Sequence, residues 1–311
     1  MPLQDPSDPP ELRAALEWLV RLKDDRAPPG LEAAFQAWLA ATPGNRAAWH
    51  EANAIWSALE PARHEYGDLL RRDRHLGRRK LIAGLGAAAV LGGAGWAASR
   101  PRLWADQTTL AGQTRQLRLE DGSGIAMGSR SALRVDLGPD QRRIVLVQGE
   151  AFFTVAPGPR PFVVRAAGVT LRTQMADFNL QMNGDRVVLA VADHEVALDL
   201  PGQPTIRVAS GWQAGYAAGR ALDPVQTEAQ DIGAWRQGRM IFRNTPLGDV
   251  LAEIARWRGG SISTLDGAVA SIPVTGIFDT TQPDAALRTI VQTLGLRMWR
   301  LPGQITLIRA A

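Results

Sequence analysis

Residues 71–100 read RRDRHLGRRKLIAGLGAAAVLGGAGWAASR, and this segment divides the chain into two unlike parts. Six of its first ten residues are Arg or Lys, whereas the next nineteen, Leu81 to Ser99, carry no charge. Nineteen helical residues at about 1.5 Å each span roughly 28 Å, close to the bilayer core of about 30 Å. We therefore expect a basic juxtamembrane segment over residues 71–80 and a single transmembrane helix over residues 81–99.

The basic residues lie on the N-terminal flank of the apolar run, with only Arg100 and Arg102 just after it. Basic flanks stay in the cytoplasm, so the N-terminus should be cytoplasmic and the C-terminal part exported. Gly77-Arg78-Arg79-Lys80 also resembles a twin-arginine export signal, which tolerates a weakly apolar run. Arg78 and Arg79 either form that signal or only supply positive-inside charge.

Two other interpretations of the apolar run stay open. A buried core helix rich in Ala and Gly would have this composition, although no polar face recurs at helical spacing. A cleaved signal peptide fits the sequence poorly, because signal peptides lie at the N-terminus and eighty residues precede the run.

Composition excludes several classes of function. The chain of 311 residues suggests two or three domains, and it has no Cys, so disulfides, thiol nucleophiles and cysteine metal sites are excluded. Its net charge of +4 is unevenly distributed: residues 1–70 carry a net charge of −5 and residues 71–80 carry +5. The positive charge is therefore local, which argues against a nucleic-acid-binding face.

Residues 1–70 are expected to form a small all-α cytoplasmic domain of three short helices. Pro28-Pro29-Gly30 and Pro43-Gly44 bound the second helix, and Asn45 is a candidate N-cap for the third. A domain this small leaves part of each large ring near its surface, and its negative charge suits a basic partner; core packing is the simpler alternative. The candidate partner-binding residues are Trp18, Phe35, Trp38, Trp49 and Trp56.

Residues 105–220 have the pattern of an all-β domain, a sandwich or roll with short strands and regular turns. Asp121-Gly122 lies in E-D-G-S-G, which predicts a hairpin turn, because no helix signal follows to make it a phosphate loop. The predicted strands are Arg143–Val147, Phe162–Arg165, Val169–Thr173, Arg186–Val191 and Thr205–Val208.

Residues 238–311 predict a small α+β domain with the element order β-α-β-β-α-β-β. Pro246 precedes a helix with Leu247 on its apolar face, and Pro283 begins a second helix. Two strands, Leu296–Arg300 and Ile305–Ile308, should close the domain as a hairpin.

No sequence motif indicates catalysis or a metal site. The four His residues have no partner at metal-ligand spacing, and no nucleophile-elbow, phosphate-loop or zinc-protease pattern occurs. Asp193-His194-Glu195 is the one polar cluster that looks like a site, although it more simply begins a strand or sits in a turn. We expect no enzyme activity and no cofactor.

Three blocks of sequence carry a resemblance to a known family. The first comprises W-L-V-R-L (18–22), F-Q-A-W-L (35–39) and N-R-A-A-W (45–49). The second comprises G-Q-T-R-Q-L-R-L-E-D-G-S (112–123), S-A-L-R-V (131–135), R-I-V-L-V-Q-G-E-A-F-F-T-V (143–155) and P-F-V-V (161–164). The third is F-R-N-T-P-L-G-D-V-L-A-E-I-A-R (242–256). With these blocks the chain resembles the FecR family of single-pass anti-sigma regulators of bacterial cell-surface signalling.

The resemblance implies a sigma-binding function for residues 1–70 and a periplasmic sensor beyond the span. In that family the C-terminal domain is similar to the short N-terminal module of secretins and TonB-dependent transducers. The implied partners are an extracytoplasmic-function sigma factor, a TonB-dependent outer-membrane transducer and a membrane protease that acts near residues 81–104. The implied location is the bacterial inner membrane, and iron-transport regulation is a typical role. The motif residues that carry over are Asp121, Gly122, Gly149, Glu150, Phe152, Pro246 and Leu247.

The sequence departs from the family at one step. Many members have Gly-Thr just before a Phe in the β domain, and some cleave themselves there. Here the segment reads Thr173-Gln174-Met175-Ala176-Asp177-Phe178, so we expect no self-cleavage.

Two alternative functions stay open. One is an envelope accessory protein that binds a secretin or a cell-wall polymer. The other is a periplasmic hydrolase that uses Asp193, His194 or Glu195.

Overall fold

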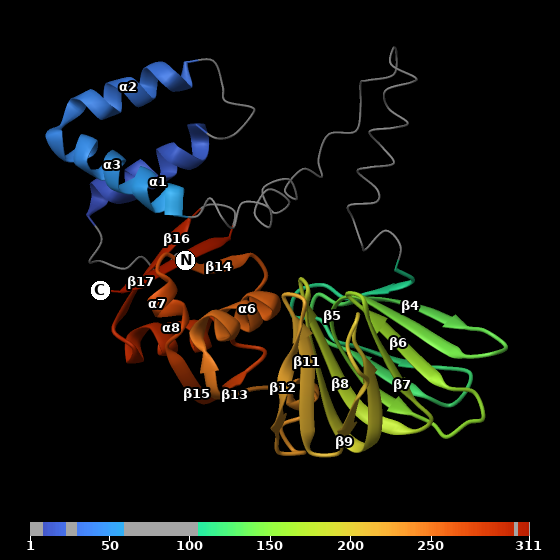
Figure 1. The fold of residues 1–311 in the computed structure, drawn as a ribbon. Helices are drawn as coiled ribbons and strands as arrows, with labels where there is room; N and C mark the ends of the chain where they lie inside the picture. The colour runs from blue at the N-terminus through green and yellow to red at the C-terminus, as the bar shows by residue number, and fades with distance from the viewer. Residues whose placement is uncertain (1–8, 23–29, 59–104, 302–303, 311) are drawn as a thin grey trace, which may run out of the picture.

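The structure is a computed structural model that describes residues 9–22, 30–58, 105–301 and 304–310 (Figure 1). Among these residues, no helix combines the length and the apolarity that crossing a bilayer requires. The expected transmembrane helix, residues 81–99, and the basic segment before it lie outside the described residues.

The N-terminal part is helical, as predicted: α1 spans Pro10–Leu22, α2 spans Leu31–Ala41 and α3 spans Pro43–Ala58. The prediction that Asn45 caps the third helix is wrong, because α3 already begins at Pro43. Thr42 caps it instead, since its hydroxyl accepts the backbone N–H of Asn45 at 3.1 Å. The Asn45 side chain donates back to the carbonyl of Trp38 at 2.7 Å, which satisfies the end of α2.

Twelve strands follow, and the predicted all-β class is confirmed. The first four predicted strands lie within β5, β6, β7 and β9, and the fifth is shifted by one residue, since β10 begins after Thr205; β5 and β9 extend well beyond the prediction. The strands are β1 (Gln107–Thr108), β2 (Arg115–Arg118), β3 (Gly124–Met127), β4 (Ala132–Leu137), β5 (Arg142–Val155), β6 (Phe162–Ala166), β7 (Val169–Thr173), β8 (Ala176–Asn183), β9 (Arg186–Asp199), β10 (Ile206–Ala209), β11 (Trp212–Ala217) and β12 (Arg220–Gln226).

The strands form a sandwich whose two sheets share β5 and β9. The first half of β5 pairs with β4 and β6, and its second half pairs with β3 and β8 in the other sheet. In the same way, β9 pairs first with β8 and β11 and then with β7 and β10. Both strands change sheet at a residue with positive φ, Gly149 at 87° and His194 at 63°. The sheets enclose one apolar core that contains Phe153, Phe162 and Phe178.

The C-terminal part has the predicted element order, with one further short helix, α7, between β14 and β15. Its strands form two sheets: β13 pairs with β15, and β17 lies between β14 and β16. The elements are η3 (Ala234–Gln237), β13 (Arg239–Pro246), α6 (Leu247–Arg258), β14 (Ser261–Thr264), α7 (Gly267–Ala270), β15 (Pro273–Asp279), α8 (Pro283–Thr293), β16 (Leu296–Leu301) and β17 (Ile305–Ala310).

The helical part packs against the sheet of β14, β17 and β16, with α1 and α3 nearer to it than α2 (Figure 1). A transmembrane helix at residues 81–99 with a cytoplasmic N-terminus would place these two parts on opposite sides of the bilayer. This packed arrangement and that topology therefore exclude each other within one molecule at one time. The buried cluster that joins the two parts contains Leu12, Ala15, Leu19, Ala48, Ala52, Trp299, Ile305 and Leu307.

Candidate functional site

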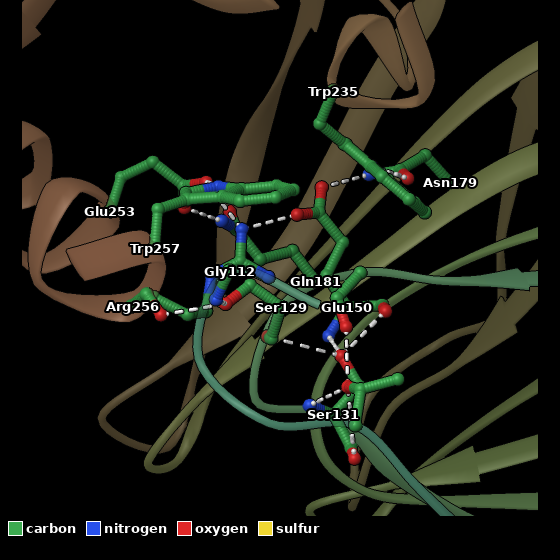
Figure 2. Close-up of polar contacts among 12 residues, drawn as sticks. Gly112, Ser129, Ser131, Glu150, Asn179, Gln181, Trp235, Glu253, Arg256 and Trp257 are labelled. Carbon is green, nitrogen blue, oxygen red and sulfur yellow. Dashed lines mark hydrogen bonds and ion pairs between the residues drawn. The ribbon is translucent and has the colours of Figure 1, made fainter. Parts of the chain in front are cut away.

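A buried ion pair joins the β sandwich to the C-terminal part (Figure 2). Glu150 of β5 accepts from the guanidinium of Arg256 in α6, and only 7% and 12% of these side chains are exposed. The same guanidinium bonds Glu253, one turn earlier on α6. One cation therefore holds two carboxylates, each from a different part of the fold.

Neutral side chains complete this polar network. The other Glu150 oxygen accepts from Asn179 of β8 at 2.8 Å, and Asn179 accepts from the indole N–H of Trp235 at 3.0 Å. On the opposite side, Glu253 accepts from Trp257 at 2.8 Å and from Gln181 at 2.7 Å. These bonds satisfy carboxylate lone pairs that would otherwise be costly to bury.

Two serine hydroxyls in the loop before β4 bond the backbone of α6 and of β5. The hydroxyl of Ser129 donates to the carbonyl of Arg256 at 2.7 Å and accepts from the backbone of Gly112 at 2.9 Å. Ser131 donates to the carbonyl of Glu150 at 2.8 Å and accepts from the Glu150 N–H at 2.9 Å. The loop before β4 thus contacts both ends of the ion pair.

The charges in the network perturb one another. Burial raises the pKa of Glu150; attraction to Arg256 opposes this rise without cancelling it, and the Glu253 carboxylate adds to it. Burial would lower the pKa of Arg256, but Glu150 and Glu253 together raise it above its ordinary value. Arg256 therefore stays charged, and the raised pKa of Glu150 makes the stability of this interface depend on pH.

Apolar contacts surround the network. Phe152 lies two residues after Glu150 in β5 and belongs to the same buried cluster as Trp235 and Leu247. The guanidinium of Arg236 lies 3.4 Å from the centroid of the Phe152 ring, a cation–π contact. The polar groups of this interface already bond one another, which suits a structural link between the C-terminal part and β5.

The motif residues predicted from the sequence fall into two places. Glu150, Phe152 and Leu247 lie at the interface just described, and Pro246 is the N-cap residue of α6. Asp121 and Gly122 lie elsewhere, in the turn between β2 and β3, where Gly122 has a φ of 85°.

Asp121 anchors a second buried ion pair, with Arg142 at 2.9 Å. Burial would raise the pKa of Asp121, but hydrogen bonds from Ser123 and Arg142 outweigh it and lower the pKa. Arg142 is 2% exposed and also donates to the carbonyls of Ala156, Arg160 and Gln174. This cluster closes one end of the sandwich and is a structural centre.

Gly149 is required where β5 changes sheet. A Cβ atom there would lie 2.5 Å from the hydroxyl of Ser131, 2.6 Å from its Cα and 2.8 Å from the carbonyl of Arg130. Only Gly combines this positive φ with so close an approach. The bend places Glu150 immediately after the corner and directs it to the interface.

The predicted partner-binding aromatic residues whose side chains are described lie together in one cluster within the helical part. Phe35 is buried and lies 4.6 Å from the ring of Trp49, 5.7 Å from that of Trp18 and 6.2 Å from that of Trp38. The rings therefore contact one another across all three helices. The side chain of Trp56 and the whole of Arg78 and Arg79 lie outside the described residues.

Asp193-His194-Glu195 lies inside β9, at its change of sheet, and does not begin a strand. His194 and Glu195 are exposed and line an open hollow of about 610 Å³ with Arg172, Met175 and other residues. Their polar atoms have local partners, since Glu195 pairs with Arg207 at 2.7 Å and His194 Nδ1 lies 3.1 Å from Asp193. Within the described part of the chain, no three acidic or His side chains are grouped to hold a metal ion.

No sequence pattern revealed the partners of Glu150. Glu253 and Arg256 lie within the third family block, but their burial could not be anticipated from a helix whose apolar face is elsewhere. Trp257, next to Arg256, is the one local signal, because it adds a large ring to the flank of that helix and is 4% exposed.

Comparisons with known proteins agree with this layout. Residues 105–197 match the FecR protein family, and residues 13–55 match a domain of unknown function, DUF4880. No curated protein matches the chain. Two crystal structures of a proposed anti-sigma factor from Parabacteroides distasonis ATCC 8503 are similar in fold, with TM-scores of 0.60 and 0.59 at 23% identity, covering 66% of this chain and 98% of that one. The resemblance drawn from the sequence is thereby confirmed over the two matched segments.

Proposed function

Starting from a chain that combines a FecR segment with a DUF4880 segment, we propose that this protein is an anti-sigma factor whose helical part, α1 to α3, binds a sigma factor. The observation that carries the proposal is the coincidence of the DUF4880 match, residues 13–55, with the three described helices. The FecR match begins at residue 105, beyond the basic and apolar run. A small acidic helical module tied to a separate β domain suits a regulator better than an enzyme.

The proposal includes a topology. The helical part would remain in the cytoplasm, residues 81–99 would cross the inner membrane once, and the sandwich with the C-terminal part would lie in the periplasm. The basic cluster at residues 71–80 supports this orientation.

The relay is the finer part of the proposal. A TonB-dependent outer-membrane transducer would contact the C-terminal part, and proteolysis near residues 81–104 would release the helical part with its extracytoplasmic-function sigma factor. The Glu150–Arg256 network supports a mechanical link, because it joins the C-terminal part to the sandwich through a buried ion pair.

Co-purification tests the function. Residues 1–76 should retain one of the organism's extracytoplasmic-function sigma factors and no unrelated sigma factor. If none of these sigma factors is retained, although circular dichroism shows the fragment to be helical, the anti-sigma function is wrong. Trp38→Ala tests the aromatic cluster in the same assay. Trp38 is half-buried and contacts the Phe35 ring, so its loss can destabilise a domain this small, and circular dichroism must show that the variant is folded.

Reporter fusions test the topology independently. A reporter that is active only in the periplasm should be active when fused after Ala311 and silent when fused after Leu70. The reverse pattern would contradict the orientation, and activity in neither fusion would contradict export.

A further inference from the structure

We propose that the face of α1 and α3 that packs on β16 and β17 is the surface through which the helical part binds its sigma factor, and that the C-terminal sheet competes for this face. The inference rests on the proposed function and adds the binding surface and its regulation. The aromatic candidates from the sequence are not the centre of this face, although Trp38 and Trp49 pack against the same buried cluster.

The contact is a closed apolar interface with one ion pair at its edge. Trp299, Ile305 and Leu307 of the sheet are 5%, 6% and 0% exposed and share one buried cluster with residues of α1 and α3. Glu51 of α3 pairs with Arg309 of β17 at 3.4 Å. The Arg309 guanidinium also lies 4.9 Å from the centroid of the Trp299 ring, which it partly covers.

The residues of the helical side lie where α1 packs against α3 and where both helices meet the sheet. Ala15, Ala48 and Ala52 are small and buried, and Leu12 and Leu19 lie seven residues apart, on one face of α1. Without the sheet, the part of this cluster that Trp299, Ile305 and Leu307 cover would be exposed, and exposed apolar surface is typical of a protein-binding site.

The aromatic cluster is less suited to recognition. Phe35 is 5% exposed and contacts Trp18, Trp38 and Trp49, one or more from each helix. These rings hold the three helices together, so their loss should unfold the helical part before it removes a specific contact.

The side chains of β16 and β17 that contact the helices indicate which chemical groups a sigma factor would need in order to bind the same face. It offers apolar side chains with a cation at the edge, Arg309, that meets Glu51. Residues 1–70 carry a net charge of −5, which favours encounter with a basic protein. A sigma factor binds the DNA polyanion and so carries basic surface, which fits this requirement.

The two occupants cannot bind together. The sheet reaches the face only while the helical and C-terminal parts lie on the same side of the membrane. Insertion in the proposed topology would separate them and leave the face free for the sigma factor. The chain would therefore bind its sigma factor weakly before export and tightly after it.

The absence of Cys from the chain permits a direct test. The full-length Glu51→Cys, Arg309→Cys variant, purified in detergent, would be joined by a cleavable bis-maleimide. Its affinity for the sigma factor found by co-purification would be measured before and after the linker is cleaved. We expect at least a tenfold weaker affinity in the linked chain and recovery on cleavage, whereas each single-Cys variant treated alike should be unaffected.

Equal affinity of the linked and cleaved chains would overturn the shared face, and so would failure of the two positions to be linked. If the unlinked chain and residues 1–76 both fail to bind any sigma factor, the proposed function itself fails. Trp299→Ala provides the opposite change: by weakening the sheet contact it should strengthen sigma binding by the detergent-purified full chain several-fold. Misfolding of the helices cannot mimic that gain, and unchanged or weaker binding would count against competition.

Discussion

Arg256 and Glu150 lie 106 residues apart in the sequence and form one buried ion pair that connects α6 to β5. Replacement by Arg256→Met should strongly destabilise the interface, because it leaves Glu150 and Glu253 as two buried carboxylates without their cation. Removing one member of a buried ion pair costs about 3–5 kcal/mol. Hydrogen exchange should show faster exchange of the α6 and β5 amides.

Arg258→Met is the matched control on the same helix. Arg258 pairs with Asp284 and Thr306 inside the C-terminal part, so its loss should loosen α6 and α8 while leaving β5 protected. If Arg256→Met also leaves β5 protected, the network does not couple the two parts.

The raised pKa of Glu150 predicts how the stability of this interface depends on pH. A carboxyl group whose folded-state pKa exceeds its unfolded value binds the proton more tightly when folded. Its contribution is therefore fully present below the ordinary value of 4.5 and declines as the pH rises above it. Urea unfolding followed by Trp fluorescence should show Glu150→Gln to be less sensitive than the wild type to a rise in pH from 5 to 8. Equal sensitivity would assign the pH dependence to other groups.

Gly149→Ala should severely destabilise the sandwich. The added Cβ would collide with the backbone and hydroxyl of Ser131, and Ala also resists the positive φ. The strain of the left-handed conformation alone costs about 1–2 kcal/mol, and the overlap adds a further cost of about 1–3 kcal/mol. Gly184→Ala is the control, because Gly184 has a φ of 59° but open space around it. Similar urea midpoints for the two variants would show that the corner can relax.

The chain should remain uncleaved between Ala176 and Asp177. The self-cleavage of related proteins needs a hydroxyl after the scissile carbonyl, which Asp177 lacks. Ala176 is 1% exposed and pairs with Val155 on one side and His194 on the other, so its backbone is held in a ladder. Immunoblots of chain tagged at both ends, from uninduced cells, should show one full-length band. A stable C-terminal fragment that starts at Asp177 would contradict this.

Linkage of positions 51 and 309 should depend on the membrane. The bis-maleimide should join Glu51→Cys to Arg309→Cys in detergent, where both parts share one solution, and should not join them in chain inserted in native membranes. Protease protection of the C-terminal part in those membranes would verify insertion. Efficient linkage in inserted, protected chain would place both parts on one side and contradict the proposed topology.

Local sequence patterns predicted many of the helices and strands, because where a helix or strand forms depends largely on residues that are neighbours in the sequence. The strand pattern predicted β7 at its observed bounds, and Pro246 and Pro283 marked the starts of α6 and α8. The third helix shows the limit, since Pro43 at its first position moved the cap from Asn45 to Thr42.

Contacts between distant segments could not be predicted in this way. The periodicity of β5 is the same whether or not it changes sheet, so the corner at Gly149 and the role of Glu150 depend on residues 131, 179 and 256. The packing of α1 and α3 against Trp299 likewise joins two segments far apart in the sequence. The apolar pattern of each segment is explained by its own helix or strand and does not indicate the other.

The short strand β1 has a mechanical consequence. It pairs with β4 at two positions, Gln107 with Leu133 and Thr108 with Ala132, at the edge of the sandwich, and hydrogen bonds of Asp106 and Thr109 flank the pairing. In the proposed topology, tension between an anchor at residues 81–99 and a load on the C-terminal part would pass through this strand first. β1 should detach under force well before the shared strands β5 and β9 yield, and optical-tweezer traces should begin with one small, reversible extension. Such a step would lengthen the tether beside the segment where we expect proteolysis.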